Sequence, residues 1–170
     1  MAAQIIGILA VAAFVLSYQC RSNKALFFIQ AIGLLLFSLQ YYMLNALAGS
    51  LSLIVCLIRN VMLLRVTTSK VIQWKGWPWI FSVVLLIITI ATWGGYRSLL
   101  SLAGTIAGTF GYWDNNAGRI RLCNLLVISP CWIVYAMLSH SIGGVLNELI
   151  AAGSIIISIK RFGWQSLMKG

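Results

Sequence analysis

Residues 25–58 read ALFFIQAIGLLLFSLQYYMLNALAGSLSLIVCLI and contain no Asp, Glu, Lys or Arg. Residues 122–147 form a second uncharged stretch. A bilayer core takes roughly 20 apolar residues for each crossing helix, so each stretch is too long for one crossing and suits most of two. The 170-residue chain is 61% hydrophobic and only 8% charged, whereas soluble domains carry about 25% charged residues. The sequence therefore predicts an all-α integral membrane protein.

Apolar runs separated by turn residues predict seven transmembrane helices. Pro78 suits the first turn of the fourth helix. Residues 1–16 lack the basic segment of a secretory signal, so we expect the first helix to remain in the mature protein. The predicted crossings are residues 3–18, 25–44, 51–66, 78–93, 98–113, 121–138 and 142–159.

Basic residues gather in alternate loops of this map. Those on one side are Arg21, Lys24, Arg65, Lys70, Lys75, Arg119, Arg121, Lys160, Arg161 and Lys169. Arg97 alone falls in the other loops, and Arg59 falls inside a helix. Because Lys and Arg are in excess in cytoplasmic loops, the N-terminus is predicted outside and the C-terminus in the cytoplasm. The same short basic segments argue against a nucleic-acid partner despite the net charge of +10, since they form no basic face.

A weak internal repeat appears when the chain is shifted against itself by 94 residues. Tyr41 then meets Tyr135, Gly49 meets Gly143, and each basic loop falls on a basic loop. Three crossings reverse the chain, so a linker helix is required if two helix triplets are to point the same way. The predicted organisation is a first triplet, a linker with the fourth helix, a second triplet and a cytoplasmic tail, at residues 1–66, 67–97, 98–160 and 161–170. Parallel repeats of this kind are a known plan for transporters.

Three motifs give this plan a family resemblance. Residues 17–24, SYQCRSNK, stand where the SWEET and PQ-loop (MtN3-like) group places its Pro-Gln turn. Trp132 and Tyr135 resemble that group's W-x-x-Y motif, and Asn147 follows near the position of its substrate-facing Asn. The 3+1+3 helix plan is similar too. Over the whole chain, the sequence most resembles the YgjV family of bacterial inner-membrane proteins, which has no assigned activity. The resemblance implies a SWEET-like fold in a bacterial inner membrane.

Arg59 and Glu148 are the only charges well inside predicted helices. A charge near the bilayer centre costs about 2.5 to 3.5 kcal/mol on insertion scales, so it usually faces protein or water and has a partner. The two lie in repeat-equivalent helices at an offset of five residues, or roughly 7.5 Å of helix rise. We therefore predict an intramembrane ion pair; the alternative is that each side chain extends to its nearer membrane surface.

Intramembrane polar residues provide the other candidates. They can line a solute cavity or tie helices together by hydrogen bonds, and Pro130 can act as a hinge or simply shape its helix. The predicted substrate-binding residues are Asn147, Asn60, Trp132, Gln40 and Asn124, with Gln30 as a further polar side chain. The four cysteines form no C-x-x-C pair and His140 is the only histidine, so neither a metal site nor a cofactor is expected.

These observations predict a small-solute transporter or facilitator that alternates access between two helix triplets. Its expected partners are the lipid bilayer and an unidentified small solute, and the sequence leaves open whether it forms a homo-oligomer. The alternative is a receptor or assembly partner on the same scaffold that does not transport. An enzyme is not expected, because no nucleophile and base, paired carboxylates or metal cluster can be assembled from these residues.

Overall fold

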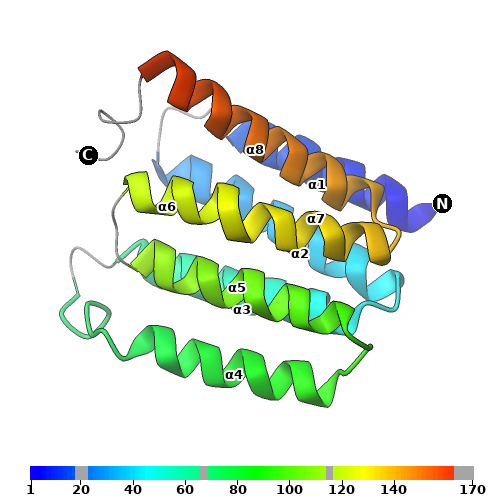
Figure 1. The fold of residues 1–170 in the computed structure, drawn as a ribbon, viewed down its shortest axis with the longest axis horizontal. Helices are drawn as coiled ribbons and strands as arrows, with labels where there is room; N and C mark the ends of the chain where they lie inside the picture. The colour runs from blue at the N-terminus through cyan, green and yellow to red at the C-terminus, as the bar shows by residue number, and fades with distance from the viewer. Residues whose placement is uncertain (18–22, 66–68, 114–116, 163–170) are drawn as a thin grey trace.

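A computed structural model describes residues 1–17, 23–65, 69–113 and 117–162, and within these ranges every regular element is helical. Three consecutive elements, α6, η1 and α7, form one continuous helical rod, so the described chain contains seven rods (Figure 1). The elements are α1 (Ala2–Ser17), α2 (Asn23–Met43), α3 (Leu47–Leu63), α4 (Trp77–Ala91), α5 (Arg97–Trp113), α6 (Ala117–Cys123), η1 (Asn124–Ile128), α7 (Ser129–Leu138) and α8 (Ile142–Phe162).

Each predicted crossing corresponds to one rod, and the ends differ by at most four residues; the sixth crossing, predicted from residue 121, begins at Ala117. The third helix begins at Leu47 and not at residue 51. The small residues Gly49 and Ser50 are part of this helix because their size lets it pack closely against its neighbours. The last helix runs to Phe162, into the segment predicted as a tail. Pro78 stands in the first turn of α4, as predicted.

Six rods form a closed ring and α4 lies outside it. The order around the ring is α1, α2, α3, α5, the α6–α7 rod and α8. Each rod contacts the next, and α8 contacts α1. The fourth helix packs against α5 and α3 at one edge of the molecule (Figure 1). A ring of helices without α4 can enclose a space, whereas α4 can only cover one side of it.

Successive rods run in opposite directions, so helix ends gather at two ends of the bundle (Figure 1). The C-terminal ends of α1, α3, α5 and α8 share one end with the N-terminal ends of α2, α4 and α6. We call this the basic end, because the described residues Arg65, Lys70, Lys75, Arg119 and Lys160 lie there. Arg97 lies at the opposite end, in the first residue of α5. The alternation of basic loops along the sequence thus becomes a separation in space.

Large apolar side chains cover the outside of the bundle, whereas many buried side chains are small and polar. On α4, Val83, Ile87 and Ile90 are exposed. On α5, Ser101, Thr105 and Thr109 are buried, and the two threonine hydroxyls donate to backbone carbonyls one turn earlier. Small residues at helix contacts and apolar residues outside are typical of helices packed in lipid.

Length and hydropathy identify candidate membrane spans among the described helices. Residues Arg119–Leu138 are long and apolar enough to cross a membrane by length and composition. Shorter apolar stretches of 10–17 residues lie in five other helices: Ala2–Ser17, Phe28–Met43, Leu47–Leu63, Trp77–Ala91 and Ile142–Ile157.

Candidate functional site

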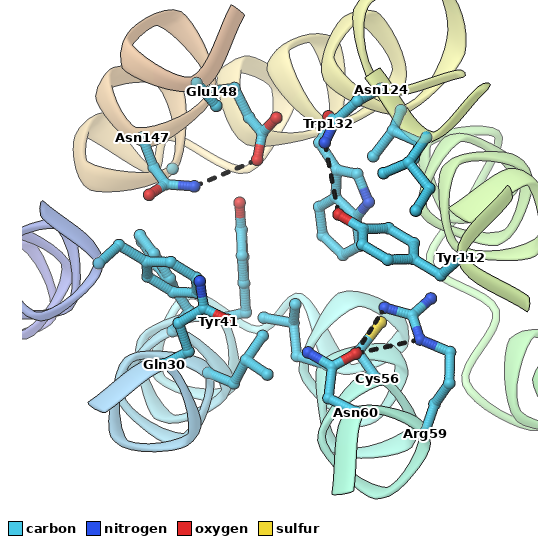
Figure 2. A pocket seen from close by; sticks show the side chains of 18 of the residues that line it. Gln30, Tyr41, Cys56, Arg59, Asn60, Tyr112, Asn124, Trp132, Asn147 and Glu148 are labelled. Carbon is cyan, nitrogen blue, oxygen red and sulfur yellow. Dashed lines mark hydrogen bonds between the residues drawn. The ribbon is translucent and has the colours of Figure 1, made fainter. Parts of the chain in front are cut away.

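The ring encloses a cavity of about 520 Å³, within the range of roughly 300 to 1,000 Å³ that is usual for small-molecule sites. Side chains from α1, α2, α3, α5, the α6–α7 rod and α8 face it (Figure 2). Its polar and aromatic lining residues are Phe14, Gln30, Phe37, Tyr41, Arg59, Asn60, Tyr112, Asn124, Trp132, Asn147 and Glu148. The lining continues to Leu63, the last residue of α3, and to Ile120 in α6, so the cavity extends towards the basic end.

Two tyrosines close the cavity at the end opposite the basic one. The Tyr135 hydroxyl accepts a hydrogen bond from the backbone N–H of Gly49 at 2.8 Å and donates to the carbonyl of Ala46 at 3.1 Å. The ring of Tyr41 lies 5.3 Å from that of Tyr135, centroid to centroid. Gly49 and Gly144 leave room for these rings, because a Cβ at either glycine would collide with a tyrosine. We call this contact the tyrosine closure.

Polar contacts between turns reinforce that end. The Gln4 amide donates to the carbonyl of His140 at 2.6 Å, and its oxygen accepts from the backbone N–H of Ile142 at 3.1 Å. Arg97 donates to the carbonyl of Asn45 at 3.2 Å. These bonds join α1 to α8 and α5 to the turn before α3. They therefore hold the closed end together at the α1–α8 contact and at the α3–α5 contact.

Replacing Tyr135 with phenylalanine tests the tyrosine closure. The backbone N–H of Gly49 would lose its hydrogen-bond partner in a buried site, which costs about 1 to 3 kcal/mol for such a group, whereas the carbonyl of Ala46 would keep the bond from the backbone N–H of Ser50. We expect Tyr135→Phe to lower the free energy of unfolding by that amount in a detergent denaturation series. Tyr42→Phe is the matched control, because the neighbouring Tyr42 is 62% exposed on the outside of α2. Equal stability of both variants would contradict the role of the hydroxyl.

Arg59 brings a positive charge to the α3 side of the cavity. Its side chain is only 6% exposed. The guanidinium donates to the amide oxygen of Asn60 at 3.1 and 3.2 Å and to the hydroxyl of Thr109 at 3.3 Å. It also stands 4.9 Å from the centroid of the Tyr112 ring, a cation–π distance. The charge is thus held by neutral groups of α3 and α5.

Glu148 brings a negative charge to the α8 side. One carboxylate oxygen accepts from the Ser129 hydroxyl at 2.8 Å and the other from the Asn147 amide at 3.2 Å. The Ser129 oxygen also lies 3.2 Å from the Asn124 amide oxygen. Since a hydroxyl carries one proton, it can serve only one of these two acceptors. An ionised carboxylate at the shorter distance is the stronger acceptor.

Polar contacts lead from one charge to the other through side chains at the wall of the cavity. From Glu148 they pass through Ser129 to Asn124, whose amide nitrogen lies 3.4 Å from the Tyr112 hydroxyl. The Tyr112 ring then meets the Arg59 guanidinium. These contacts cross from α8 through the α6–α7 rod and α5 to α3.

Of the predicted binding residues, four line the cavity and one does not. Asn60, Asn124, Trp132 and Asn147 face it (Figure 2). Gln40 is fully buried against α1, where Gly7 makes room for its side chain and its amide lies 3.4 Å from that of Gln4. The placement of Gln40 in the binding site is therefore corrected: it faces the α1–α2 contact, because only a glycine at position 7 admits its bulk.

The predicted ion pair between Arg59 and Glu148 is also corrected. All polar contacts of the guanidinium go to Asn60, Thr109 and Tyr112, and those of the carboxylate go to Ser129 and Asn147. The two charged groups lie on opposite sides of the cavity (Figure 2). Helix rise alone made a contact conceivable, but the cavity separates α3 from α8, and these helices are not neighbours in the ring.

Pro130 follows a π-helical segment, η1, in the middle of the α6–α7 rod. The backbone N–H of Ser129 donates to the carbonyl of Asn124, five residues earlier. Proline has no N–H and cannot continue the α-helical pattern, and single π-turns are frequent at functional sites. The irregular segment carries Asn124 and is followed directly by Ser129. The hinge role of Pro130 stays a prediction.

Sequence reasoning missed Tyr41, Tyr112, Ser129 and Thr109 as parts of the site. Tyr41 and Tyr112 each belong to a pair of identical residues in the 94-residue repeat, which is the one signal that could have found them. Ser129 and Thr109 are small hydroxyl residues of a kind that recurs throughout this chain, so no sequence pattern distinguishes them.

Cys56 lines the cavity, and Cys123 and Cys131 are partly buried free thiols; Cys20 lies outside the described residues. Within the described ranges, no group of three or more His, Cys, Asp or Glu side chains could hold a metal ion.

Comparison with known families gives one match. A family model described as Imp-YgjV, bacterial inner membrane protein, matches residues 1–166. No curated protein and no solved structure matches the chain.

Proposed function

We propose that this chain, which belongs to the Imp-YgjV family of bacterial inner membrane proteins, carries a small solute by alternating access between two helix triplets. The observation that carries the proposal is the cavity of about 520 Å³ inside the helix ring. Its walls carry polar and charged side chains among apolar ones, and it is closed at one end by the tyrosine closure and extends towards the other. A solute in the cavity could not leave past the tyrosine closure, and its path to the basic end is lined by Leu63 and Ile120.

Helix boundaries support the two-triplet arrangement. Adding 94 to the bounds of α1, α2 and α3 gives 96–111, 117–137 and 141–157. These ranges nearly coincide with α5, the α6–α7 rod and α8. Both contacts that close the ring, α3 with α5 and α8 with α1, then join one triplet to the other. In such a plan, rocking one triplet against the other opens a midplane cavity to alternate faces.

The repeat-equivalent tyrosines stand at the closure itself. Tyr41 and Tyr135 are separated by 94 residues and contact each other. Residues that a two-fold axis relates can touch only near that axis, so this contact supports a proposed axis that passes through the closed end. If the basic end faces the cytoplasm, with the N-terminus outside, the structure is closed to the outside and its cavity extends inward.

A receptor or assembly partner that uses the same scaffold is the second candidate. The exposed apolar surface and the polar cavity are compatible with a ligand that binds without crossing. Flux separates the two candidates, because only a carrier moves solute. An enzyme is not proposed, since the groups around the cavity provide no activated nucleophile.

Blocking the cavity tests the carrier proposal. Purified protein in liposomes should exchange at least one solute of a panel of polyols, amino acids, carboxylates and amines. Asn147→Trp places a large ring in the cavity and should lower that flux at least about tenfold. Leu149→Trp is the matched control, because Leu149 is 54% exposed on the outer face of α8, and its flux should stay within about twofold of wild type. Silence of the wild-type protein across the panel would favour the receptor or partner function.

A further inference from the structure

Both charged groups facing the cavity have unused hydrogen-bonding capacity. The Arg59 guanidinium has five N–H groups, and its bonds to Asn60 and Thr109 use three of them. Each oxygen of the Glu148 carboxylate accepts a single hydrogen bond and has a second acceptor site. The two groups do not pair with each other (Figure 2). Both groups line the same cavity, so each has hydrogen-bonding capacity left for a ligand there.

The charges restrict what this space can hold. A solute with one charge would complement one wall and leave the other charge uncompensated, and burying such a charge is costly. A solute without charge would leave both charges uncompensated. A solute with a carboxylate and an ammonium group would complement both, because each would form charge-assisted hydrogen bonds with the opposite wall. The wall also provides an apolar surface for a substituent, from Leu34, Phe37 and Leu53.

We propose that the cavity binds a small zwitterion of the amino-acid class, with its carboxylate on Arg59 and its ammonium group on Glu148. That this solute is also transported rests on the proposed function. Its binding can be measured separately, without transport. Asn60 and Asn147, beside the two charges, position the guanidinium and the carboxylate that make these contacts. The Tyr112 ring fixes the guanidinium from the side of α5.

The first experiment is titration calorimetry with the purified full-length protein in detergent. The probes are glycine, leucine, phenylalanine and γ-aminobutyrate, which vary the substituent and the distance between the charges. Each probe that binds is compared with its amide, which keeps only the positive charge, and with its N-acetyl form, which keeps only the negative charge. We expect at least one zwitterion to bind about tenfold or more tightly than either blocked form, since each blocked form loses the charge-assisted hydrogen bonds to one wall.

Two variants assign the charges. Glu148→Gln should remove the preference for the zwitterion over its N-acetyl form and keep the preference over its amide. Arg59→Gln should do the reverse. Lys75→Gln, a change of charge in the exposed segment before α4, is the control and should leave both preferences intact. If a glutamine variant does not elute as a folded species, Glu148→Asp and Arg59→Lys replace it, and each should retain its preference at least in part.

The proposal is overturned if folded wild-type protein binds none of the four zwitterions, or if a blocked form binds as tightly as its parent. It is also overturned if both variants weaken all ligands equally. Flux measurements distinguish its failure from that of the proposed function. If flux of an uncharged solute survives both substitutions, the carrier function is supported and the zwitterion proposal is rejected. If zwitterions bind with the expected preferences but no flux is measured, the proposed ligand class is supported and the carrier function is rejected.

Discussion

Alanine at position 143 should lower the free energy of unfolding by about 2 kcal/mol or more. A Cβ at Gly143 would lie 2.6 to 2.8 Å from the backbone carbonyl carbon, oxygen and Cα of Gly7. The backbone of α1 cannot rotate away as a flexible side chain can, so α1 and α8 must separate. Overpacking of this kind typically costs about 1 to 3 kcal/mol, and here the contact also closes the helix ring. Denaturation in detergent, followed by circular dichroism, measures the loss.

Gly153→Ala in the same helix is the matched control for that experiment. A Cβ at Gly153 would meet nothing within 4 Å, and alanine is favoured over glycine in a helix interior by about 1 kcal/mol. The control should therefore be neutral or more stable than wild type. If Gly143→Ala were as stable as Gly153→Ala, the close approach of α1 to α8 would be contradicted.

Methionine at position 59 should raise stability and impair function together. The Arg59 charge is buried among neutral groups without an acidic contact. Its removal should relieve a desolvation penalty, and replacing buried charges by apolar groups of similar size is often neutral or stabilising by about 1 to 4 kcal/mol. We expect Arg59→Met to raise the free energy of unfolding by about 1 kcal/mol or more. Solute flux in liposomes should fall at least about tenfold, because the binding charge is gone.

The sign of the stability change is the informative part of that result. A structural role for Arg59 would make Arg59→Met less stable, since Asn60 and Thr109 would lose a partner. A functional charge is instead retained at a cost in stability, as binding sites often are. Val61→Met, at a position 54% exposed on the outside of α3, is the control and should change neither stability nor flux appreciably.

The helices could be predicted closely from the sequence because their signal is local. Apolar run length, turn residues and Pro78 located all seven rods, and the family match confirms the bacterial inner-membrane class that the sequence indicated. The start of α3 was wrong because Gly49 and Ser50 read as turn residues in isolation. Their helical conformation depends on the Tyr135 ring and on Ser38, whose hydroxyl lies 3.0 Å from the Ser50 carbonyl oxygen.

The site could be predicted only in part, because residue type indicates polarity but not direction. Asn147, Asn60, Asn124 and Trp132 were expected at a solute site and do face the cavity. Gln40 was expected there too, yet the space beside Gly7 turns it towards α1. That space depends on how α1 packs on α2, and no local sequence pattern around Gln40 predicts this packing.

The sequence by itself determined that the chain is a set of apolar helices with basic residues in alternate connections, because hydropathy and charge act residue by residue. Only the tertiary structure decided that Arg59 and Glu148 face each other across a cavity instead of pairing. The physical reason is that α3 and α8 each contact neighbours in the ring but not one another. Which charges meet is fixed by the order of helices around that ring, and contacts between residues far apart in the chain set this order.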